Sequence, residues 1–292
     1  MKILMLSGPW VDPSEFLKMK FLLFFYIVLF FTNSVFAGEL LEGKTWELEV
    51  AKKNEPYVNQ LKDFLEIADS QFGQFFNKIG IPRVRNSKLK VTVFPDFQSY
   101  RAFQEKNSNS QSKTAFYSLF NGRVYTWKME NSHHILKNVY HESTHHYMRD
   151  YTVQENIPRC VDEGIAEIFE AGEIRGTQFQ IGQIPDGWAI ILKQSFAKKK
   201  LQPFSYFMGM TPKEFVSYQD NEFPKMHIAQ CWGMSHFLFF GDNGRWISVL
   251  KGLLSKKNLL DDSSKAMQDS IPPGFQYSDL LDHWQKFAQN PH

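Results

Sequence analysis

Cysteine is scarce in this sequence, and its scarcity excludes two kinds of stabilised fold. Only two of the 292 residues are cysteines, Cys160 and Cys231. Two cysteines cannot form a framework of several disulfides, and they are too few for a four-cysteine or zinc-finger site. The sequence leaves open whether they form a single disulfide or remain two buried thiols.

An excess of charge of one sign is also missing. Lys and Arg together number 33 against 31 Asp and Glu, and the basic run Lys198-Lys199-Lys200 is short. A nucleic-acid-binding surface needs a broader basic face, so we expect no nucleic-acid partner. Charged residues make up 22% and hydrophobic residues 43%, a balance that excludes a disordered or fibrous chain. Aromatic residues are abundant, with 28 Phe, and predict a core built on large rings.

No hydrophobic run reaches the length of about 20 residues that a membrane-spanning helix needs. The run at residues 21–31 follows Lys18 and Lys20 and precedes polar residues 32–34 and a cleavage site that ends at Ala37. This order is typical of a signal peptide. We therefore expect residues 1–37 to be cleaved, which leaves a secreted or periplasmic chain with no stable membrane span. An uncleaved anchor is the alternative.

The first residues of the chain suit a signal peptide poorly. Asp12 and Glu15 are acidic, whereas a signal peptide begins with a basic segment. A start at Met19 would give a compact basic and apolar segment. Met19 is therefore a possible true start.

The spacing of hydrophobic residues predicts strands in the first part of the mature chain and helices after them. Strand patterns cover residues 44–50 and 89–94, and a hairpin covers residues 115–127 around a two-residue turn, Asn121-Gly122. Helical spacing covers residues 58–79, 97–105, 135–150, 161–171, 188–198, 225–240, 245–254 and 277–289. The expected fold class is α+β.

Two stretches of low periodicity, residues 176–185 and 200–212, are the best candidates for a domain boundary. We expect an N-terminal lobe with a small mixed sheet over residues 38–180. A mainly helical C-terminal lobe is expected over residues 181–292.

A metal-binding motif lies inside one of the predicted helices. Residues His141-Glu142-Ser143-Thr144-His145 match H-E-x-x-H, and neither Pro nor Gly interrupts the helical spacing around them. Two His at this spacing lie one turn apart on one helix face, so both imidazoles can reach a single cation. Glu142 is rotated by about 100° from His141. Its carboxylate would lie beside the cation, where it can accept a proton from water.

Acidic residues on the next predicted helix are placed to complete such a site. Glu163 lies 18 positions after His145, in the segment E-G-I-A-E, and Glu167 follows one helical turn later. A short connection can fold this helix face back toward the two His. The pair of motifs is therefore more specific than H-E-x-x-H alone.

Together, the two motifs resemble those of the gluzincin metallopeptidases, which include thermolysin-like proteases and the membrane aminopeptidase superfamily. The likeness covers residues 141–170 and is strongest to secreted bacterial proteins with an E-G-x-A-E helix. It implies a zincin-like N-terminal lobe and a Zn²⁺ ion held by His141, His145 and Glu163. It also implies that Glu167 shares a hydrogen bond with the first His, His141, and fixes its tautomer.

The resemblance further implies hydrolysis of peptide bonds in a peptide or protein substrate. A zinc-activated water would attack the carbonyl, with Glu142 as the general base that later delivers the proton to the leaving amine. The substrate is expected to pair with the strand at residues 115–120. Because no G-x-M-E-N motif precedes the zinc helix, an endopeptidase is favoured over an aminopeptidase.

Parts of the sequence depart from related patterns. The Trp that usually precedes the Glu-Gly pair is replaced by residues 158–161, which affects the expected substrate contacts. Metzincins are excluded, because the residues three and six positions after His145 are not Gly and His. A Tyr or His from a later helix often steadies the oxyanion in gluzincins. His227 is the candidate for this catalytic role, and His236 and Tyr218 are weaker candidates.

Two other interpretations remain open. The chain could be a catalytically inactive secreted protein of the same fold that binds zinc or serves as a scaffold. It could also be an envelope protein without a metal, in which H-E-x-x-H is accidental. His146 is rotated by about 100° from His145, so we expect it to face solvent or pack in the core.

Overall fold

The computed structural model describes most of the chain after the expected signal peptide. The described residues are 38–108, 110–152, 157–176, 178–210, 214–215, 224–255 and 263–291. The predicted signal peptide at residues 1–37, the possible start at Met19 and the candidate Tyr218 lie outside them.

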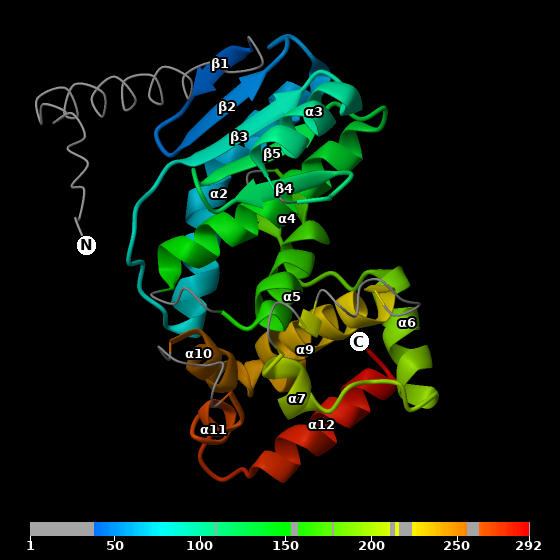
Figure 1. Ribbon diagram of the computed structural model, residues 1–292. Helices are drawn as coiled ribbons and strands as arrows, with labels where there is room; N and C mark the ends of the chain where they lie inside the picture. Colours follow the sequence, from blue (N-terminus) through cyan, green and yellow to red (C-terminus); the bar gives the residue numbers. More distant parts are fainter. Residues whose placement is uncertain are drawn as a thin grey trace, which may run out of the picture. The chain divides into compact units, whose positions relative to one another are not determined.

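A mixed sheet of five strands comes first along the described chain (Figure 1). The strand order is β1-β2-β3-β5-β4, with parallel pairs β2/β3 and β3/β5 and antiparallel pairs at both ends. Strand β4 therefore lies at one edge of this sheet. The strands are β1 (Glu39–Glu42), β2 (Trp46–Val50), β3 (Leu89–Phe94), β4 (Ala115–Ser118) and β5 (Arg123–Trp127).

Helices α2, α3 and α4 pack on this sheet. The other regular elements of the described chain are further helices and a small hairpin of β6 (Glu173–Arg175) and β7 (Gln178–Gln180). The longest helices are α2, α4 and α9. The helices are α2 (Pro56–Ile79), α3 (Phe97–Asn107), α4 (Ser132–Tyr151), α5 (Arg159–Glu170), α6 (Asp186–Ala197), α7 (Phe204–Met208), α9 (Pro224–Gly244), α10 (Ile247–Ser255), α11 (Ser263–Gln268) and α12 (Tyr277–Gln289).

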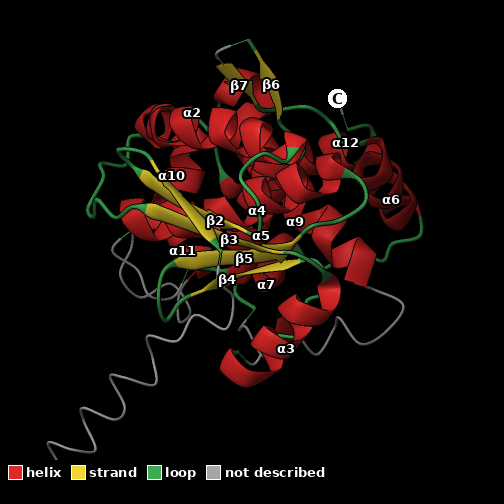
Figure 2. Cartoon of the chain, turned by 90° about the horizontal axis from the view of Figure 1, so that it is seen from above, coloured by secondary structure: helices red, strands yellow, loops and turns green. Residues whose placement is uncertain are grey.

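Successive side chains along each strand point to opposite sides, so the sheet has two faces, each with helices packed on it. Leu48 and Val124 belong to the main core, on the face that α2 and α4 cover. Phe94 and Tyr125 point to the opposite face and pack against Phe103 of α3, with ring centroids 5.1 and 4.6 Å away. Figure 2 shows α2 and α4 on one side of the sheet and α3 on the other. One face is therefore buried in the main core, whereas the other is covered by α3 over β3 and β5 and carries the partly exposed ion pairs of Arg123 with Glu47 and Glu49.

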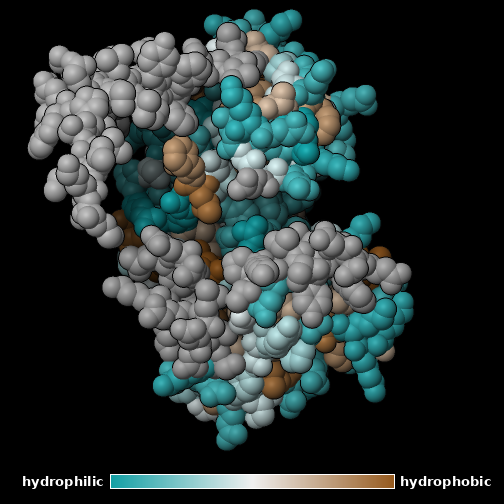
Figure 3. Space-filling view, viewed as in Figure 1, coloured by the Kyte–Doolittle hydropathy of each residue, from teal (hydrophilic) through white to brown (hydrophobic). Residues whose placement is uncertain are grey.

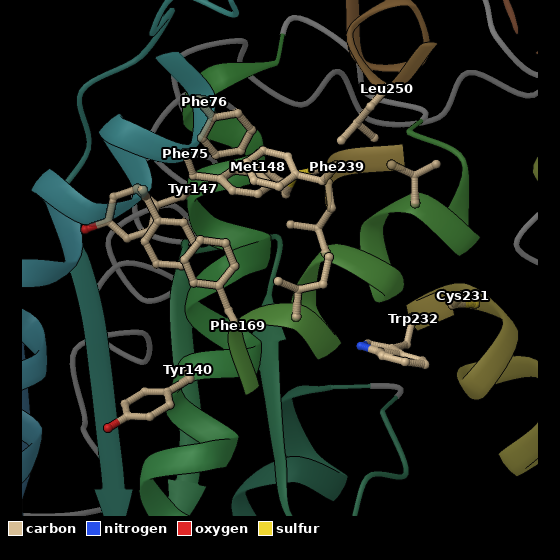
Figure 4. Close-up of a cluster of buried hydrophobic side chains, with 14 of the residues drawn as sticks. Phe75, Phe76, Tyr140, Tyr147, Met148, Phe169, Cys231, Trp232, Phe239 and Leu250 are labelled. Carbon is tan, nitrogen blue, oxygen red and sulfur yellow. The ribbon is translucent and has the colours of Figure 1, made fainter. Parts of the chain in front are cut away.

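Stacked aromatic rings join the sheet-covering helices to the later ones, as the Phe content predicts. Phe72 of α2 lies against both Tyr147 of α4 and Phe169 of α5, at centroid distances of 4.2 and 4.0 Å. Phe75 stacks on Phe239 of α9 at 4.4 Å. The labelled rings in Figure 4 show this cluster where α2, α4, α5 and α9 meet. The helix that carries H-E-x-x-H thus packs against α2 and α5, and α2 in turn packs against α9.

Helices α5 and α9 approach each other closely at Gly164. A Cβ atom at this position would collide with the backbone carbonyl of Cys231 and the hydroxyl of Ser235. The glycine of E-G-I-A-E therefore has a packing role, because no larger residue fits between the two helices. Cys160 and Cys231 are both buried and free, and the Cys160 thiol donates to the sulfur of Met208 at 3.3 Å.

The hairpin turn, the two boundary candidates and the end of α9 can each be compared with the sequence prediction. The hairpin turn has four residues, 119–122, because Ser118 pairs with Arg123 and Gly122, at φ 65°, donates back to Ser118. The two stretches expected to be a boundary contain strand β7 and helix α7. The regular helical backbone of α9 ends at residue 240, as predicted, because residues 241–243 have non-helical backbone angles.

The fold class is α+β, as predicted. Residues 38–292 form one compact unit, and the division near residue 180 into two lobes stays a prediction. Among the described helices, none combines the length and apolar character needed to cross a membrane. The face drawn in Figure 3 is mostly hydrophilic, with small scattered hydrophobic groups, as on ordinary globular surfaces.

Candidate metal centre

The H-E-x-x-H residues lie in the middle of the uninterrupted helix α4. Its N-terminus is capped by Asn131, whose side chain accepts a hydrogen bond from the backbone N–H of His133. The rings of His141 and His145 are one turn apart, with centroids separated by 5.3 Å. The helix therefore presents both imidazoles on one face, as their spacing predicts.

The first turns of α5 bring Glu163 to the two imidazoles. Glu163 is buried, and its Oε2 lies 3.2 Å from Nε2 of His141. His141, His145 and Glu163 each offer one ligand atom, and these three atoms lie within 4.8 Å of one another. The fold thus brings together the three residues that the sequence analysis assigns to Zn²⁺.

Two further carboxylates of α5 hold the other nitrogen of each imidazole. Glu170 Oε2 lies 2.9 Å from Nδ1 of His141, and Asp162 Oδ1 lies 2.8 Å from Nδ1 of His145. With Nδ1–H donated to a carboxylate, Nε2 is left as the atom that can bind a metal ion. Carboxylate partners of this kind fix the ring orientation and raise the basicity of a ligand imidazole.

The hydrogen bond to His141 differs from the expectation, because Glu170 makes it and Glu167 does not. Glu167 Oε1 lies 3.8 Å from Nδ1 of His141, beyond hydrogen-bond distance. The indole N–H of Trp188, on α6, instead donates to Oε2 of Glu167 at 2.7 Å. Burial raises the pKa of Glu167 to about 7. Glu167 is thus next to the cluster but is held by Trp188.

Arg159 supplies positive charge to the acidic side of the cluster. Its guanidinium forms ion pairs with the carboxylates of Asp162 and Glu163. Burial opposes ionisation of Glu163, but Arg159 and His141 outweigh it and hold the pKa of Glu163 well below its usual range. The pKa of Asp162 is lowered against burial by His145. Both carboxylates are therefore ionised at neutral pH, the form that a metal site requires.

Glu142 lies beside the cluster without belonging to it. Neither group of described residues that could hold a metal ion includes its carboxylate. Burial raises the pKa of Glu142, while His141 and His145 act in the opposite direction. A half-buried carboxylate close to, but outside, the ligand group is placed as a general base would be.

A second group of three potential ligands shares His141 with the first. It consists of His141, Glu167 and Glu170, and so would use Nδ1 in place of Nε2. The first group offers two imidazoles and one carboxylate, the donor set of thermolysin-type catalytic zinc. The second offers a single imidazole, and Trp188 already occupies Glu167. The donor chemistry therefore favours the first group.

The candidates for an oxyanion donor have other surroundings. The His227 ring lies between Phe207 and Phe215, at centroid distances of 5.7 and 6.4 Å, and burial lowers its pKa. His236 shares a hydrogen bond with the carbonyl of Gly182 at 3.2 Å. These contacts do not bring either ring to the His141 cluster, and the oxyanion role of His227 stays a prediction.

His146 follows the expectation of a core position. It is buried, its Nε2 lies 3.3 Å from the carbonyl oxygen of Ser87, and its ring packs edge-on against Tyr147. Desolvation lowers its pKa. His146 is therefore a packing residue, rotated by about 100° from His145 around α4.

Four residues of the cluster were missed by the sequence analysis: Asp162, Arg159, Glu170 and Trp188. Three of them lie on the same helix as Glu163, at offsets of one, four and seven residues. Helical spacing from Glu163 could therefore have found Arg159 and Glu170, whereas Asp162, at offset one, does not share its face. Trp188 had no such signal, because it comes from α6 after the β6-β7 hairpin.

Comparison with protein-family models finds no match to this chain, and comparison with curated proteins finds none either. The resemblance to gluzincins therefore rests on the motif residues quoted above and on their geometry.

Proposed function

We propose that this protein is a secreted or periplasmic zinc metallopeptidase that hydrolyses peptide bonds. The observation that carries the proposal is the convergence of His141, His145 and Glu163, with both Nδ1 atoms held by carboxylates. An accidental H-E-x-x-H would not need an acidic partner behind each imidazole. The paired carboxylates instead suit rings that must present Nε2 to a cation.

The residues present fit Zn²⁺. Two neutral imidazoles and one carboxylate make three ligands, which leaves the open position that distinguishes catalytic from structural zinc sites. When bound, the ion would polarise a water molecule and the substrate carbonyl. The contact of Arg159 with Glu163 balances the carboxylate charge before an ion binds.

The chain's own residues would perform the remaining steps. Glu142 would accept a proton from the attacking water and deliver it to the amine nitrogen as the peptide bond breaks. One carboxylate would thus serve as base and then as acid.

The edge strand β4 is the element against which we expect an extended substrate to lie. β4 runs beside α4: Thr114 lines a cavity with His134, Tyr117 faces His146, and the Leu119 carbonyl accepts from Arg149. Its outer edge can form main-chain hydrogen bonds with a peptide of any sequence. A peptide paired there would pass along the helix face that carries His141 and His145.

The test combines metal analysis with peptide cleavage by the purified protein. We expect close to one zinc per chain by elemental analysis, and cleavage of a mixed peptide library that stops on chelation and returns with added zinc. Glu142→Gln should keep the zinc and lose at least about a hundredfold in rate. Zinc binding without any cleavage would favour the inactive zinc-binding protein, and absence of zinc would leave the motif accidental.

A further inference from the structure

A cavity of about 550 Å³ opens beside the candidate metal centre. Its volume lies in the range of sites that hold a small ligand or a large side chain. Glu167 and Glu170 of α5 form one side, Lys137 and Asn138 of α4 another, and Trp188 closes it from α6. None of these residues is a proposed zinc ligand, so the cavity is distinct from the metal position.

Glu170 joins the cavity to the site. One of its oxygens holds Nδ1 of His141, while its side chain is 37% exposed and lines the cavity. Asn138 lies one helical turn before His141 on the same face of α4. Thr114, which also lines the cavity, directly precedes β4. A peptide paired with β4 and passing His141 would therefore place a side chain over this cavity.

The charge of the lining is negative. Glu167, Glu170 and Glu173 face a single ammonium group, that of Lys137, which donates to the carbonyl of Gly172 at 2.8 Å. Burial and Lys137 lower the pKa of His133, so this lining residue adds no charge at neutral pH. Even with Glu167 protonated, two carboxylates outnumber one ammonium group. A negative cavity favours a positively charged occupant.

A buried acceptor without a donor points to the same kind of occupant. The side-chain oxygen of Gln183 is buried, and no described residue donates a hydrogen bond to it. Gln183 lines the cavity together with Trp188. An unsatisfied buried acceptor is unfavourable, and a donor from a ligand would supply the missing hydrogen bond. The indole of Trp188 adds an aromatic surface of the kind that attracts a cation.

We infer that this cavity is the subsite for a lysine or arginine side chain next to the scissile bond of the substrate. The inference rests on the proposed peptidase function and names its substrate class. An ammonium or guanidinium group donates to Gln183 and to the carboxylates at once. An acidic side chain would be repelled, and an apolar one would leave these acceptors without donors.

The experiment uses matched peptides and the full purified protein. Cleavage sites in a mixed library are first located by mass spectrometry. Peptides are then made with Arg, citrulline, norleucine or Glu at each position flanking the bond. Citrulline keeps the shape of Arg and removes its charge. At one of these positions we expect kcat/KM for Arg to exceed that for citrulline by about tenfold or more, since hydrogen bonds to charged groups contribute more than neutral ones.

Variants that leave the metal centre intact test the assignment. Gln183→Leu and Glu173→Gln should each reduce the Arg-to-citrulline ratio, whereas Lys137→Gln should increase it, because a repelling ammonium group is removed. Opposite shifts from neighbouring positions would not result from a general loss of folding. Zinc content and thermal unfolding are measured on each variant as controls.

The outcomes separate the two proposals. Cleavage with equal rates for Arg and citrulline, or with a preference for Glu, overturns the subsite and leaves the peptidase standing. Failure of every peptide to be cleaved overturns the peptidase and the subsite with it. The preference for Arg could also stay unchanged in Gln183→Leu and Lys137→Gln. The Arg side chain would then bind outside this cavity, and the assignment would be overturned.

Discussion

Asp162 holds His145 from behind, with Oδ1 2.8 Å from Nδ1 of the imidazole. The residue directly precedes Glu163, so one short segment of α5 supplies both a proposed ligand and the partner of another. This adjacency couples the orientation of the second imidazole to the position of the third ligand. A shift of the start of α5 would disturb both at once.

Asp162→Ala should therefore weaken zinc binding by about 10- to 100-fold, because His145 loses the partner that orients it. Asp162→Asn should lose less zinc affinity, since the amide oxygen can still accept a hydrogen bond from Nδ1–H of His145. Competition with a chromophoric chelator measures both affinities. Asp282→Ala, at an exposed position of α12, is the matched control. An affinity unchanged in Asp162→Ala would show that the contact does not orient the ring.

Glu163→Ala should remove zinc, whereas Glu167→Gln should keep it. Glu163 is the carboxylate within reach of both imidazoles, and Glu167 is held by Trp188. Elemental analysis of the two purified variants measures the difference. If Glu167→Gln loses the metal and Glu163→Ala retains it, the third ligand belongs to the second group of residues.

Gly164→Ala should destabilise the protein, because the new methyl group meets the carbonyl of Cys231 across the α5-α9 contact. Overpacking of this kind costs about 1–3 kcal/mol. Gly187→Ala is the control, since a methyl group there has open space and lies in helix α6. Urea unfolding should show a lower midpoint for the first variant only. Equal midpoints would mean that α5 and α9 can move apart without a loss of stability.

Asp96 caps α3, and its contribution to stability should depend on pH. Its side chain accepts from the backbone N–H of Ser99, and this bond lowers the pKa of Asp96 below 3.8. The stability from the charged cap is present above the unfolded pKa and is lost as the pH falls through the lower folded value. Asp96→Ala should thus destabilise the protein at pH 7, and less so in acid, where the carboxyl group is protonated in the folded protein as well.

Asp96→Asn gives the comparison that isolates the charge. The amide oxygen can still cap the helix but does not titrate in this range. The difference in unfolding midpoint between Asp96→Asn and Asp96→Ala should therefore change little with pH. The difference between the native protein and Asp96→Ala should change more. Denaturant unfolding at several pH values measures the three proteins. If the unfolding midpoints of all three proteins changed with pH in parallel, the charge of Asp96 would not contribute to capping α3.

The sequence predicted the parts of the site that depend on spacing within a helix. His141 and His145 converge because their separation equals about one turn, and Glu163 follows on a helix that could fold back. Predicted and observed ends of most helices differ by three residues or fewer, since hydrophobic spacing marks their buried faces. Local periodicity was sufficient for these features.

Features that depend on contacts between distant segments could not be predicted in this way. Glu167 was expected to hold His141, but Trp188 reaches it from another helix and leaves Glu170 for that role. His227 was chosen by residue type alone, and its ring lies between two phenylalanines. Which carboxylate meets which ring depends on how α4, α5 and α6 cross, and no local pattern encodes those crossings.

The ring of Phe72 between Tyr147 and Phe169 bears on how a metal would be acquired. Tyr147 follows His145 by two residues and Phe169 precedes Glu170, so this stack fastens both ligand-bearing helices to α2. Small zinc domains assemble only when the ion arrives, and chelation unfolds them. Here the apolar core would instead hold the ligand residues in place before the ion binds. A chelator should therefore abolish peptide hydrolysis while the protein stays folded.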